Sequence, residues 1–545
     1  MKLFQLLARE SKTSLPRLGM MAAVAGGSNA AVLAIVNQAA AMLGKGGSQF
    51  QAVVLFGLAV FAYVYAQRYV LLVTAEEVEN VVHRQRQGLI DKLHRSELAG
   101  IEHIGRGLIF NAITADTQVI SQTANGLVLG VQAVILIIWA AIYLAAISPT
   151  SLILVVLILG IAAQIYRRKI LVVKAALQKA GMEQGALHDL VSGILEGFKE
   201  VKLSTRRAYA VIADAAEASA RTSAFRKQAQ GALAAHFIFA QVSFFVLLGA
   251  VVFIMPTLVP SYSETIMKTL TAVMFLIGPI SGVMTAVPQM AVANAAAENI
   301  QRLSDLLDDN LKEPLQEELA HDPRAPQFSR LELRHAYFRH ASGDNRFSVG
   351  PINLTVNAGE VIFITGGNGS GKTTFLKMLT ALYPCAAGEI VLDGVGVTRE
   401  HVQAYRDLFC GVFADFHLFA KFYGVAMPSL DEATRWTERM EIAEKVRILP
   451  DRFSTTDLST GQRKRLAYIA AVFENKPIII LDEWAADQDP HFRAKFYNEL
   501  IPELKAMGKT VIAITHDDRY FHQADRRLHM DEGRLTELTK DAAHE

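Results

Sequence analysis

Residues 361–374 read VIFITGGNGSGKTT, and this stretch decides the fold of the C-terminal half of the chain. The apolar run 361–365 predicts a buried β-strand, and the pair Phe375-Leu376 begins the helix that follows. The spacing G-x-x-x-x-G-K-T between a strand and a helix is typical of a phosphate-binding loop. A glycine-rich turn arising by chance would not have both flanks correct. We therefore expect an α/β domain that binds a nucleotide.

The residues of this loop have distinct expected roles. Glycines let backbone N–H groups converge on phosphate oxygens, and the start of the helix adds partial positive charge. Lys372 is expected to reach the β- and γ-phosphates, and the Thr373 hydroxyl to bind Mg²⁺. The predicted nucleotide-binding residues of the loop are Gly366, Gly367, Asn368, Gly369, Ser370, Gly371, Lys372, Thr373 and Thr374.

Two later apolar runs also end in polar residues. Residues 478–481 predict a buried strand that ends at Asp482 and Glu483. Such a pair often only caps a strand, but with a phosphate loop upstream we expect Asp482 to bind Mg²⁺ and Glu483 to act as general base. Residues 510–514 predict a third strand, which ends at His516. A lone histidine is usually structural, yet this one is expected at the sheet edge where ligands bind.

Residues 458–467 read LSTGQRKRLA and precede a predicted helix. Ser459, Gly461 and Gln462 offer a hydroxyl and N–H donors to phosphate. This segment, the phosphate loop, the Asp-Glu strand and the His strand together resemble the ATP-binding-cassette (ABC) ATPases. The resemblance implies ATP and Mg²⁺, and a head-to-tail homodimer in which Lys372 of one chain and Ser459 of the other share one γ-phosphate.

The resemblance also implies roles for single residues, with two departures. It places Asp489 on the D-loop and makes His516 the switch histidine. Ala414 occupies the place of the usual Q-loop glutamine, so Asp415 or a water is expected to substitute at the metal. Thr460 replaces a signature glycine. The adenine-stacking position falls on His340, with Tyr337 nearby.

The N-terminal half reads as membrane-spanning. The chain of 545 residues is 51% hydrophobic and 20% charged, with a net charge of +1, which excludes a broad basic surface for nucleic acid. Long stretches without charge predict transmembrane helices rather than buried core helices of a soluble protein. We expect six spans, near residues 18–43, 49–75, 119–146, 150–168, 233–256 and 269–292.

Charge in the loops predicts the orientation. Lys and Arg are concentrated before the first span and in two long loops, about 76–118 and 167–232, whereas the short loops contain only Lys45 and Lys268. Both termini and the ATPase domain are therefore expected in the cytoplasm. The long loops lack turn signals, so membrane helices are expected to continue into them. Residues 3–15 fit an interfacial helix. The predicted domains are residues 1–298 in the membrane, an acidic linker at 299–330, and the ATPase domain at 331–545.

The resemblance covers the whole chain. It implies a six-span α-helical transmembrane domain of ABC exporter type fused to an α/β P-loop ATPase domain. Residues 366–372, 482–490 and 516–521 are similar to the bacterial branch that exports cyclic peptides, including pyoverdine-type siderophore precursors, syringomycin-type lipopeptides and microcins. Location in the bacterial inner membrane, ATP-driven export and a peptide-type cargo are what this similarity implies. Residues 196–200 resemble the family's coupling region.

The spans themselves leave the cargo open. Their cores carry no charge, so an ion relay is not expected. Polar uncharged residues either line a cargo cavity or form hydrogen bonds between helices; they are Asn37, Gln38, Asn125, Gln132, His236, Gln241, Ser281 and Gln289. A peptide fits such a lining, and so does a lipid or a hydrophobic drug. Pro279 and Pro288 predict kinks in the sixth span. Cys385 and Cys410 are interpreted as packing residues.

Overall fold

A computed structural model describes Gln5 and residues 15–43, 50–258, 263–310, 328–339 and 347–538. The chain divides into two compact units, residues 1–90 with 107–305, and residues 91–106 with 306–545. Most of the predicted interfacial helix at 3–15, the adenine candidate His340 and residues 311–327 of the predicted linker lie outside the described residues.

Helices make up the described part of the first unit. In chain order the helices from the first unit, with the short π-helical turns η1 and η2, are α2 (Leu15–Leu43), α3 (Phe50–His94), α5 (Arg106–Asn111), η1 (Ala112–Asp116), α6 (Thr117–Ile147), α7 (Pro149–Glu196), α8 (Phe198–Leu203), α9 (Thr205–Gly249), η2 (Ala250–Ile254), α10 (Met255–Leu258), α11 (Ser263–Phe275) and α12 (Ile277–Asp309).

Six helical stretches among the described residues are long and apolar enough to cross a membrane, which confirms the six predicted spans. Helices α3, α7 and α9 contain 45, 48 and 45 residues. At 1.5 Å per residue, each is about twice as long as the roughly 30 Å hydrocarbon core requires. The two long loops are therefore largely continuations of membrane helices.

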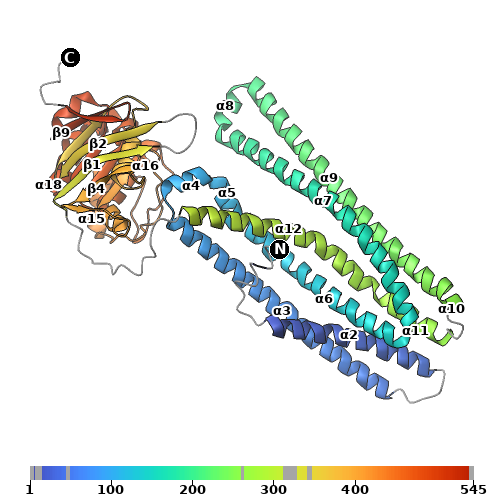
Figure 1. The fold of residues 1–545 in the computed structure, drawn as a ribbon. Helices are drawn as coiled ribbons and strands as arrows, with labels where there is room; N and C mark the ends of the chain where they lie inside the picture. Colours follow the sequence, from blue (N-terminus) through green and yellow to red (C-terminus); the bar gives the residue numbers. More distant parts are fainter. Residues whose placement is uncertain are drawn as a thin grey trace. The chain divides into compact units, whose positions relative to one another are not determined.

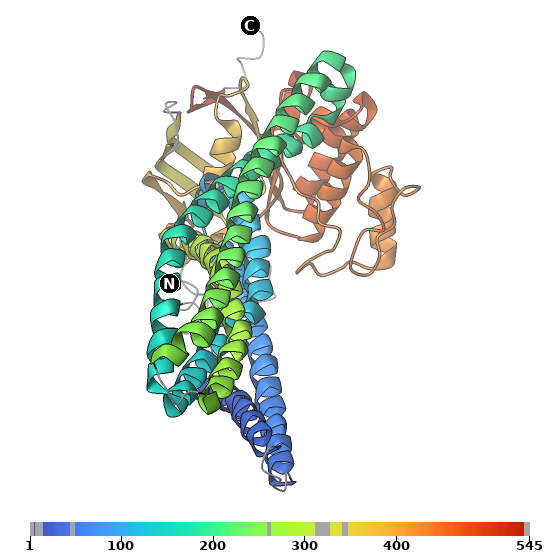
Figure 2. The ribbon, with the colours of Figure 1, turned by 90° about the vertical axis from the view of Figure 1, so that its right-hand side faces the viewer.

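Helices α7 and α9 run side by side and form a long hairpin with α8 at its tip (Figures 1 and 2). Ser148 caps α7 and Ser204 caps α9, each by accepting a hydrogen bond from a backbone N–H three residues later. No residue of α8 is buried, and the side chains of Phe198 and Leu203 are exposed. The tip therefore exposes two large apolar side chains among charged ones.

Helices α6 and α12 pack closely through small residues. A Cβ atom added at Gly130 would overlap the Cβ of Ala286, and one added at Gly282 would lie 3.1 Å from the Cβ of Ala133. Gly126, one turn before Gly130, leaves room for the side chain of Gln289 in the same way. Glycines spaced by four allow two membrane helices to approach to backbone contact.

The sixth span is interrupted at Leu276, between α11 and α12. Pro279 lies three residues later and has no N–H to donate to the carbonyl of Phe275, which explains the break. Pro288 lies inside α12. That helix continues to Asp309, eleven residues into the predicted linker, because Ile300, Leu303 and Leu307 bury one helical face.

The second unit is an α/β domain with a helical segment from the first loop, α4 (Leu98–Ile104). Its strands are β1 (Arg330–Arg339), β2 (Ser348–Asn357), β3 (Val361–Thr365), β4 (Ala387–Leu392), β5 (Val395–Gly396), β6 (Phe409–Val412), β7 (Ile478–Asp482), β8 (Thr510–Ile514), β9 (Arg526–Asp531) and β10 (Arg534–Leu538). Its other helices, with the short 3-10 and π-helical turns, are α13 (Lys372–Leu379), α14 (Val402–Arg406), α15 (Leu430–Arg439), α16 (Thr460–Phe473), η3 (Trp484–Asp487), α17 (Pro490–Lys495), η4 (Phe496–Leu500), α18 (Ile501–Ala506) and η5 (Asp518–Gln523).

The described strands form two sheets (Figure 1). An antiparallel sheet has the order β2-β1-β4-β5, and a larger sheet has the order β10-β9-β3-β8-β7-β6. All neighbours in the larger sheet are parallel except β9 and β10. Alternate residues of β3 enter two different cores, with Val361 and Phe363 on one face and Ile362 and Ile364 on the other. A parallel strand covered on both faces is apolar throughout, as the sequence predicted.

Helix α4 packs onto this second unit. Leu98 and Ala99 lie against the core that contains β3 and α13. The Glu102 carboxylate accepts hydrogen bonds from Lys377 Nζ at 3.1 Å and from the Tyr383 hydroxyl at 2.6 Å. Because Lys377 belongs to α13, α4 is attached to the helix that begins at the phosphate loop. The sequence had directed attention to the second loop only.

Candidate active site

Three parallel strands bring the predicted site together at one sheet edge. Strand β8 lies between β3 and β7, with Ile364 paired to Ile514 and Asp482 also paired to Ile514. The phosphate loop, the Asp482-Glu483 pair and His516 follow the carboxyl ends of these strands. In sheets of this kind ligands bind in the crevice at those ends.

The phosphate loop has the backbone that its glycines permit. Gly366, Gly369 and Gly371 have φ values of 143°, 80° and 105°, and a Cβ on Gly366 would overlap the carbonyl oxygen of Met530. Lys372 begins α13, and its Nζ donates to the carbonyl oxygens of Gly366 at 3.0 Å and Gly367 at 2.9 Å. The ammonium group thus lies inside the loop, in the position to meet a phosphate.

A cavity of about 440 Å³ opens at the loop. It is lined by Phe347, Ser348, Gly367, Asn368, Gly369, Ser370, Asp531 and Glu532. The hydroxyl of Ser370 is buried and has no hydrogen-bond partner. An unpaired buried hydroxyl is unfavourable, so a ligand oxygen at this point would stabilise the loop.

Thr373 and Asp482 meet behind the loop. Thr373 Oγ1 donates to Asp482 Oδ2 at 3.0 Å, and the backbone N–H of Ala414 lies 3.4 Å from the same oxygen. Burial raises the pKa of the Asp482 carboxyl, and the Thr373 hydrogen bond partly opposes that shift. The other oxygen, Asp482 Oδ1, is buried and unpaired. A hydroxyl beside an unpaired carboxylate oxygen suits a divalent cation whose remaining ligands come from a nucleotide.

Glu483 and His516 face each other across the end of the sheet. His516 Nε2 lies 3.4 Å from Glu483 Oε1, and both border a cavity of about 240 Å³. Glu483 has a φ of 48°, a left-handed backbone conformation that is rare for residues other than glycine. Its N–H donates to the carbonyl oxygen of Ile514 at 3.2 Å, which connects the backbone of β7 to that of β8.

The loop that carries His516 is fixed from behind. The Tyr497 hydroxyl donates to Asp517 Oδ2 at 2.9 Å, and Arg493 lies 3.4 Å from Asp517 Oδ1. The N–H of Asp517 donates to the Thr515 hydroxyl at 3.0 Å. Sequence analysis had not identified Tyr497 or Arg493, because the π-helical turn η4 and α17 have no pattern that marks them as polar partners.

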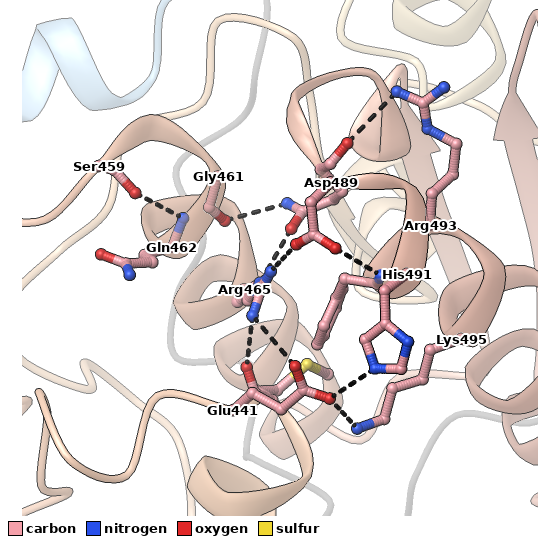
Figure 3. Close-up of polar contacts among 12 residues, drawn as sticks. Glu441, Ser459, Gly461, Gln462, Arg465, Asp489, His491, Arg493 and Lys495 are labelled. Carbon is pink, nitrogen blue, oxygen red and sulfur yellow. Dashed lines mark hydrogen bonds and ion pairs between the residues drawn. The ribbon is translucent and has the colours of Figure 1, made fainter.

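The predicted signature segment lies at the start of α16 (Figure 3). Ser459 is exposed and caps the helix, accepting from the N–H of Gln462 at 3.5 Å. Gln488 Nε2 donates to the carbonyl oxygen of Gly461 at 3.0 Å. Within the described residues no hydrogen bond joins Ser459 or Gly461 to the phosphate loop of the same chain.

Arg465 connects this helix to the loop around Asp489 (Figure 3). Its guanidinium donates to Gln488 Oε1 at 2.9 Å and Asp489 Oδ2 at 2.9 Å, and it stacks 3.5 Å from the ring centroid of Phe492. Asp489 also caps α17 by accepting from the N–H of Phe492, and that bond, with Arg465, lowers the pKa of its carboxyl. The signature helix and the Asp489 loop therefore form one connected surface.

Comparison with known families decides the identity of this unit. Residues 349–486 match the family model described as ABC transporter, and this stretch contains the phosphate loop, the signature segment and Glu483. The second unit is an ABC transporter ATPase domain. With the six apolar spans it gives the chain the architecture of an exporter-type ABC half-transporter, in which the ATPase is coupled to transport. An architecture with one ATPase domain per chain implies a dimer.

A solved structure confirms the fold of the whole chain. The ATP-bound structure of a bacterial Atm1-family ABC exporter superposes with a TM-score of 0.74 at 18% identity, covering 96% of this chain and 94% of that one. The predicted fold class is therefore correct for both halves.

Among curated proteins the chain is similar over its full length to the ATP-binding protein SyrD of Pseudomonas syringae pv. syringae, with 29% identity over 95% of this chain and 93% of that protein. The ATP-dependent lipid A-core flippase of Burkholderia pseudomallei (strain 1710b) is 29% identical over 49% of this chain and 45% of that protein. The probable syringafactin export ATP-binding/permease protein SyfD of Pseudomonas syringae pv. syringae (strain B728a) is 33% identical over 38% and 33%.

The structure describes two further residues predicted at the site, Asp415 and Tyr337. Asp415 is exposed, and the contact to Asp482 in this segment comes instead from the backbone of Ala414. Tyr337 lies partly buried on β1. Among the described residues, no group of three or more His, Cys, Asp or Glu is arranged to bind a metal. The side chain that lies within hydrogen-bond distance of Asp482 is that of Thr373, at 3.0 Å.

Proposed function

We propose that two copies of this chain form an exporter that uses ATP to move a peptide-type cargo across the bacterial inner membrane. The cargo class includes a cyclic peptide, a lipopeptide or a peptide siderophore precursor. The termini and the ATPase domain lie in the cytoplasm, as the distribution of Lys and Arg in the loops favours.

Each nucleotide lies between two copies in this proposal. Lys372 and the N–H groups of the phosphate loop bind the β- and γ-phosphates of one ATP, and Ser459 of the second copy binds the same γ-phosphate. Ser459 is exposed, and within the described residues no hydrogen bond joins it to the phosphate loop of its own chain, which supports this arrangement. Thr373 and Asp482 would hold Mg²⁺, which would neutralise charge that develops on the phosphates.

Hydrolysis uses Glu483 as the general base. A water oxygen attacks the γ-phosphorus while the bond to the β–γ bridging oxygen breaks, and the carboxylate of Glu483 takes the water proton. His516, 3.4 Å from Glu483, orients the base and the γ-phosphate. The presence of both groups favours a working ATPase over a nucleotide-gated scaffold without transport.

The single observation that carries the cargo assignment is an unpaired amide group in a largely apolar cavity within the membrane unit. It has a volume of about 600 Å³ and lies among α2, α3, α6, α11 and α12. Gln67 Nε2 donates to Gln132 Oε1 at 3.0 Å, while Gln132 Nε2 is buried without a hydrogen-bond partner. An unpaired amide N–H₂ in an uncharged cavity favours a ligand with carbonyl oxygens, such as a peptide backbone.

The other polar candidates from the sequence divide into two groups. Asn37 Nδ2 donates to the Tyr143 hydroxyl at 3.1 Å, which is the hydrogen bond between helices that the alternative interpretation expected. Gln241 is exposed on α9. Gln289 Oε1 is buried without a hydrogen-bond partner, as Gln132 Nε2 is, but of these two only Gln132 lines the cavity.

A lipid or hydrophobic drug is the second candidate cargo. Leu129, Leu136, Met274, Phe275 and Ile277 give the cavity a largely apolar wall, which would suit acyl chains. The partial similarity to lipid A-core flippases supports the same alternative.

Transport into inside-out proteoliposomes separates the two cargo classes. With ATP, we expect a fluorescent cyclic lipopeptide to accumulate and a fluorescent phosphatidylethanolamine to remain in its leaflet. Gln132→Leu should raise the half-saturating peptide concentration roughly twofold to tenfold, the value of one lost hydrogen bond, while the matched control Gln241→Leu should not. ATP-dependent movement of the lipid without the peptide would establish the alternative.

A further inference from the structure

Lys464 is a buried lysine of α16, with 4% of its surface exposed. Its Nζ donates to the backbone carbonyl oxygen of Glu483 at 2.8 Å and forms an ion pair with Asp487 Oδ2 at 2.7 Å. Its own carbonyl oxygen accepts a hydrogen bond from Trp484 Nε1 at 2.8 Å. Side chain and backbone of this one residue therefore both bind the segment that follows β7.

Packing alone does not explain a lysine at this point. Burial of an ammonium group is unfavourable unless it is paired, and an apolar side chain of similar length would fill the same space. What the ammonium adds is a charged donor to the carbonyl oxygen of Glu483. That residue is in the left-handed conformation, which L-residues other than glycine rarely adopt without support from their surroundings.

The position of Lys464 on α16 connects two different nucleotides. The same helix begins with the exposed cap Ser459, five residues before Lys464 and about 7.5 Å away along the helix axis. In the proposed dimer Ser459 faces the ATP bound by the second copy, whereas Glu483 acts on the ATP of its own chain. If the nucleotide at Ser459 displaces α16, that displacement also moves Glu483, the base that acts on the nucleotide of the other site.

We propose that Lys464 is a positioning residue that holds Glu483 in its active backbone conformation and couples the two ATP sites of the dimer. This inference rests on the proposed dimeric function. ATP at Ser459 sets the position of α16, and Lys464 transmits that position to the carbonyl of Glu483 in the same chain. Arg465, the next residue on the same helix, donates to Asp489 (Figure 3), whereas Lys464 donates to Glu483, so the two basic residues have separate targets.

Substitutions at Lys464 distinguish the hydrogen bond from the charge. Lys464→Met removes both the hydrogen bond to Glu483 and the ion pair with Asp487, with little change in side-chain length. We expect the ATPase kcat of the purified dimer to fall about tenfold to a hundredfold, with KM changed less than about threefold. Lys464→Gln can still donate to Glu483 and should retain more of the kcat than Lys464→Met. Asp487→Asn leaves the donor to Glu483 in place and should remain near wild type.

The control is Lys505→Gln, which removes an exposed ion pair to Asp525 in the same domain. Its kcat should be unchanged. The Hill coefficient for ATP is a second measurement, which should fall from about 2 toward about 1 in Lys464→Met. A Lys464→Met protein with unchanged kcat and Hill coefficient would overturn the inference, and so would an equal loss in Lys464→Met and Lys505→Gln.

Mixed dimers separate positioning of Glu483 from damage to the signature helix. One chain carries Glu483→Gln, so a single base remains. Lys464→Met in the chain with the intact Glu483 should reduce the remaining ATPase activity about as strongly as Lys464→Met in both chains. Lys464→Met in the Glu483→Gln chain should have little effect. The reverse pattern would mean that the substitution acts through Ser459 on the neighbouring nucleotide.

If Lys464→Met fails to fold, the mixed dimers are made with Lys464→Gln and Lys464→Arg, which keep a donor, and the same pattern is required at smaller amplitude. Failure of the proposed function gives a different result. In that case the purified protein would not dimerise with ATP, or Glu483→Gln alone would leave kcat unchanged, whatever stands at position 464.

Discussion

The tips of the two long loops of this chain, the short helices α4 and α8, have similar lengths and opposite surroundings. Helix α4 at the tip of the first loop packs onto the ATPase domain of its own chain through Leu98, Ala99 and Glu102. Helix α8 at the tip of the second loop has no buried residue. The comparison teaches that the first tip is fixed by apolar and charged contacts, whereas the second tip keeps its apolar side chains exposed.

The largest expected effect comes from the ATPase reaction itself. Glu483→Gln should lower the ATPase kcat by about a hundredfold or more, because the general base is lost, while ATP binding persists. Steady-state phosphate release and nucleotide binding by filtration measure the two quantities. Glu499→Gln is the matched control, since Glu499 is an exposed carboxylate in the same domain. Unchanged turnover in Glu483→Gln would show that Glu483 is not the general base.

The second largest effect is expected at α8, the exposed tip of the second loop. Phe198→Asp replaces an exposed aromatic side chain of α8 with a charged one and should reduce cargo-stimulated ATPase activity and transport about tenfold, while basal ATPase activity persists. Val191→Asp, at an exposed site on α7, is the control. If both variants behave alike, the tip has no docking role and the contrast with α4 has no functional meaning.

A smaller effect is expected at the covered tip. Glu102→Ala removes the acceptor of both Lys377 and Tyr383, and we expect about a fivefold loss of cargo stimulation. Glu102→Gln retains an acceptor and should lie between the wild type and the alanine variant. Stimulation that is fully retained in Glu102→Ala would show that the apolar contacts of Leu98 and Ala99 are sufficient.

The smallest effect is expected for Tyr383→Phe, which removes one hydroxyl and keeps the ring stacked on Phe338 at 4.6 Å between centroids. The free energy of unfolding of the ATPase domain should fall by about 0.5–1.5 kcal/mol, with cargo stimulation changed less than twofold. Denaturant titration of the full-length protein followed by tyrosine fluorescence measures the first quantity. A loss as large as that of Glu102→Ala would mean that Tyr383, and not Lys377, carries the contact.

Sequence patterns were sufficient to predict residues whose place in the fold is determined by the few residues around them. The phosphate loop follows from its glycines and flanking elements, and Asp482, Glu483 and His516 follow from their places after apolar strands. The six spans follow from length and missing charge. In each case a short segment contains the physical reason for its own conformation.

Residues that act through tertiary contacts could not be predicted. Lys464 and Arg465 belong to a run of three basic residues that reads as a solvated helix face, and only the fold shows that both side chains are buried. The attachment of α4 depends on Lys377 and Tyr383, which lie far from Glu102 in sequence. Likewise Gln67 had no feature that distinguished it from other polar residues until it was found beside Gln132.

The close contact of α6 and α12 limits how the membrane half can open. Where Gly130 meets Ala286 and Gly282 meets Ala133, only methyl groups separate the two helices. We therefore expect these two helices to move together at these points, and a cargo opening to form elsewhere in the membrane unit.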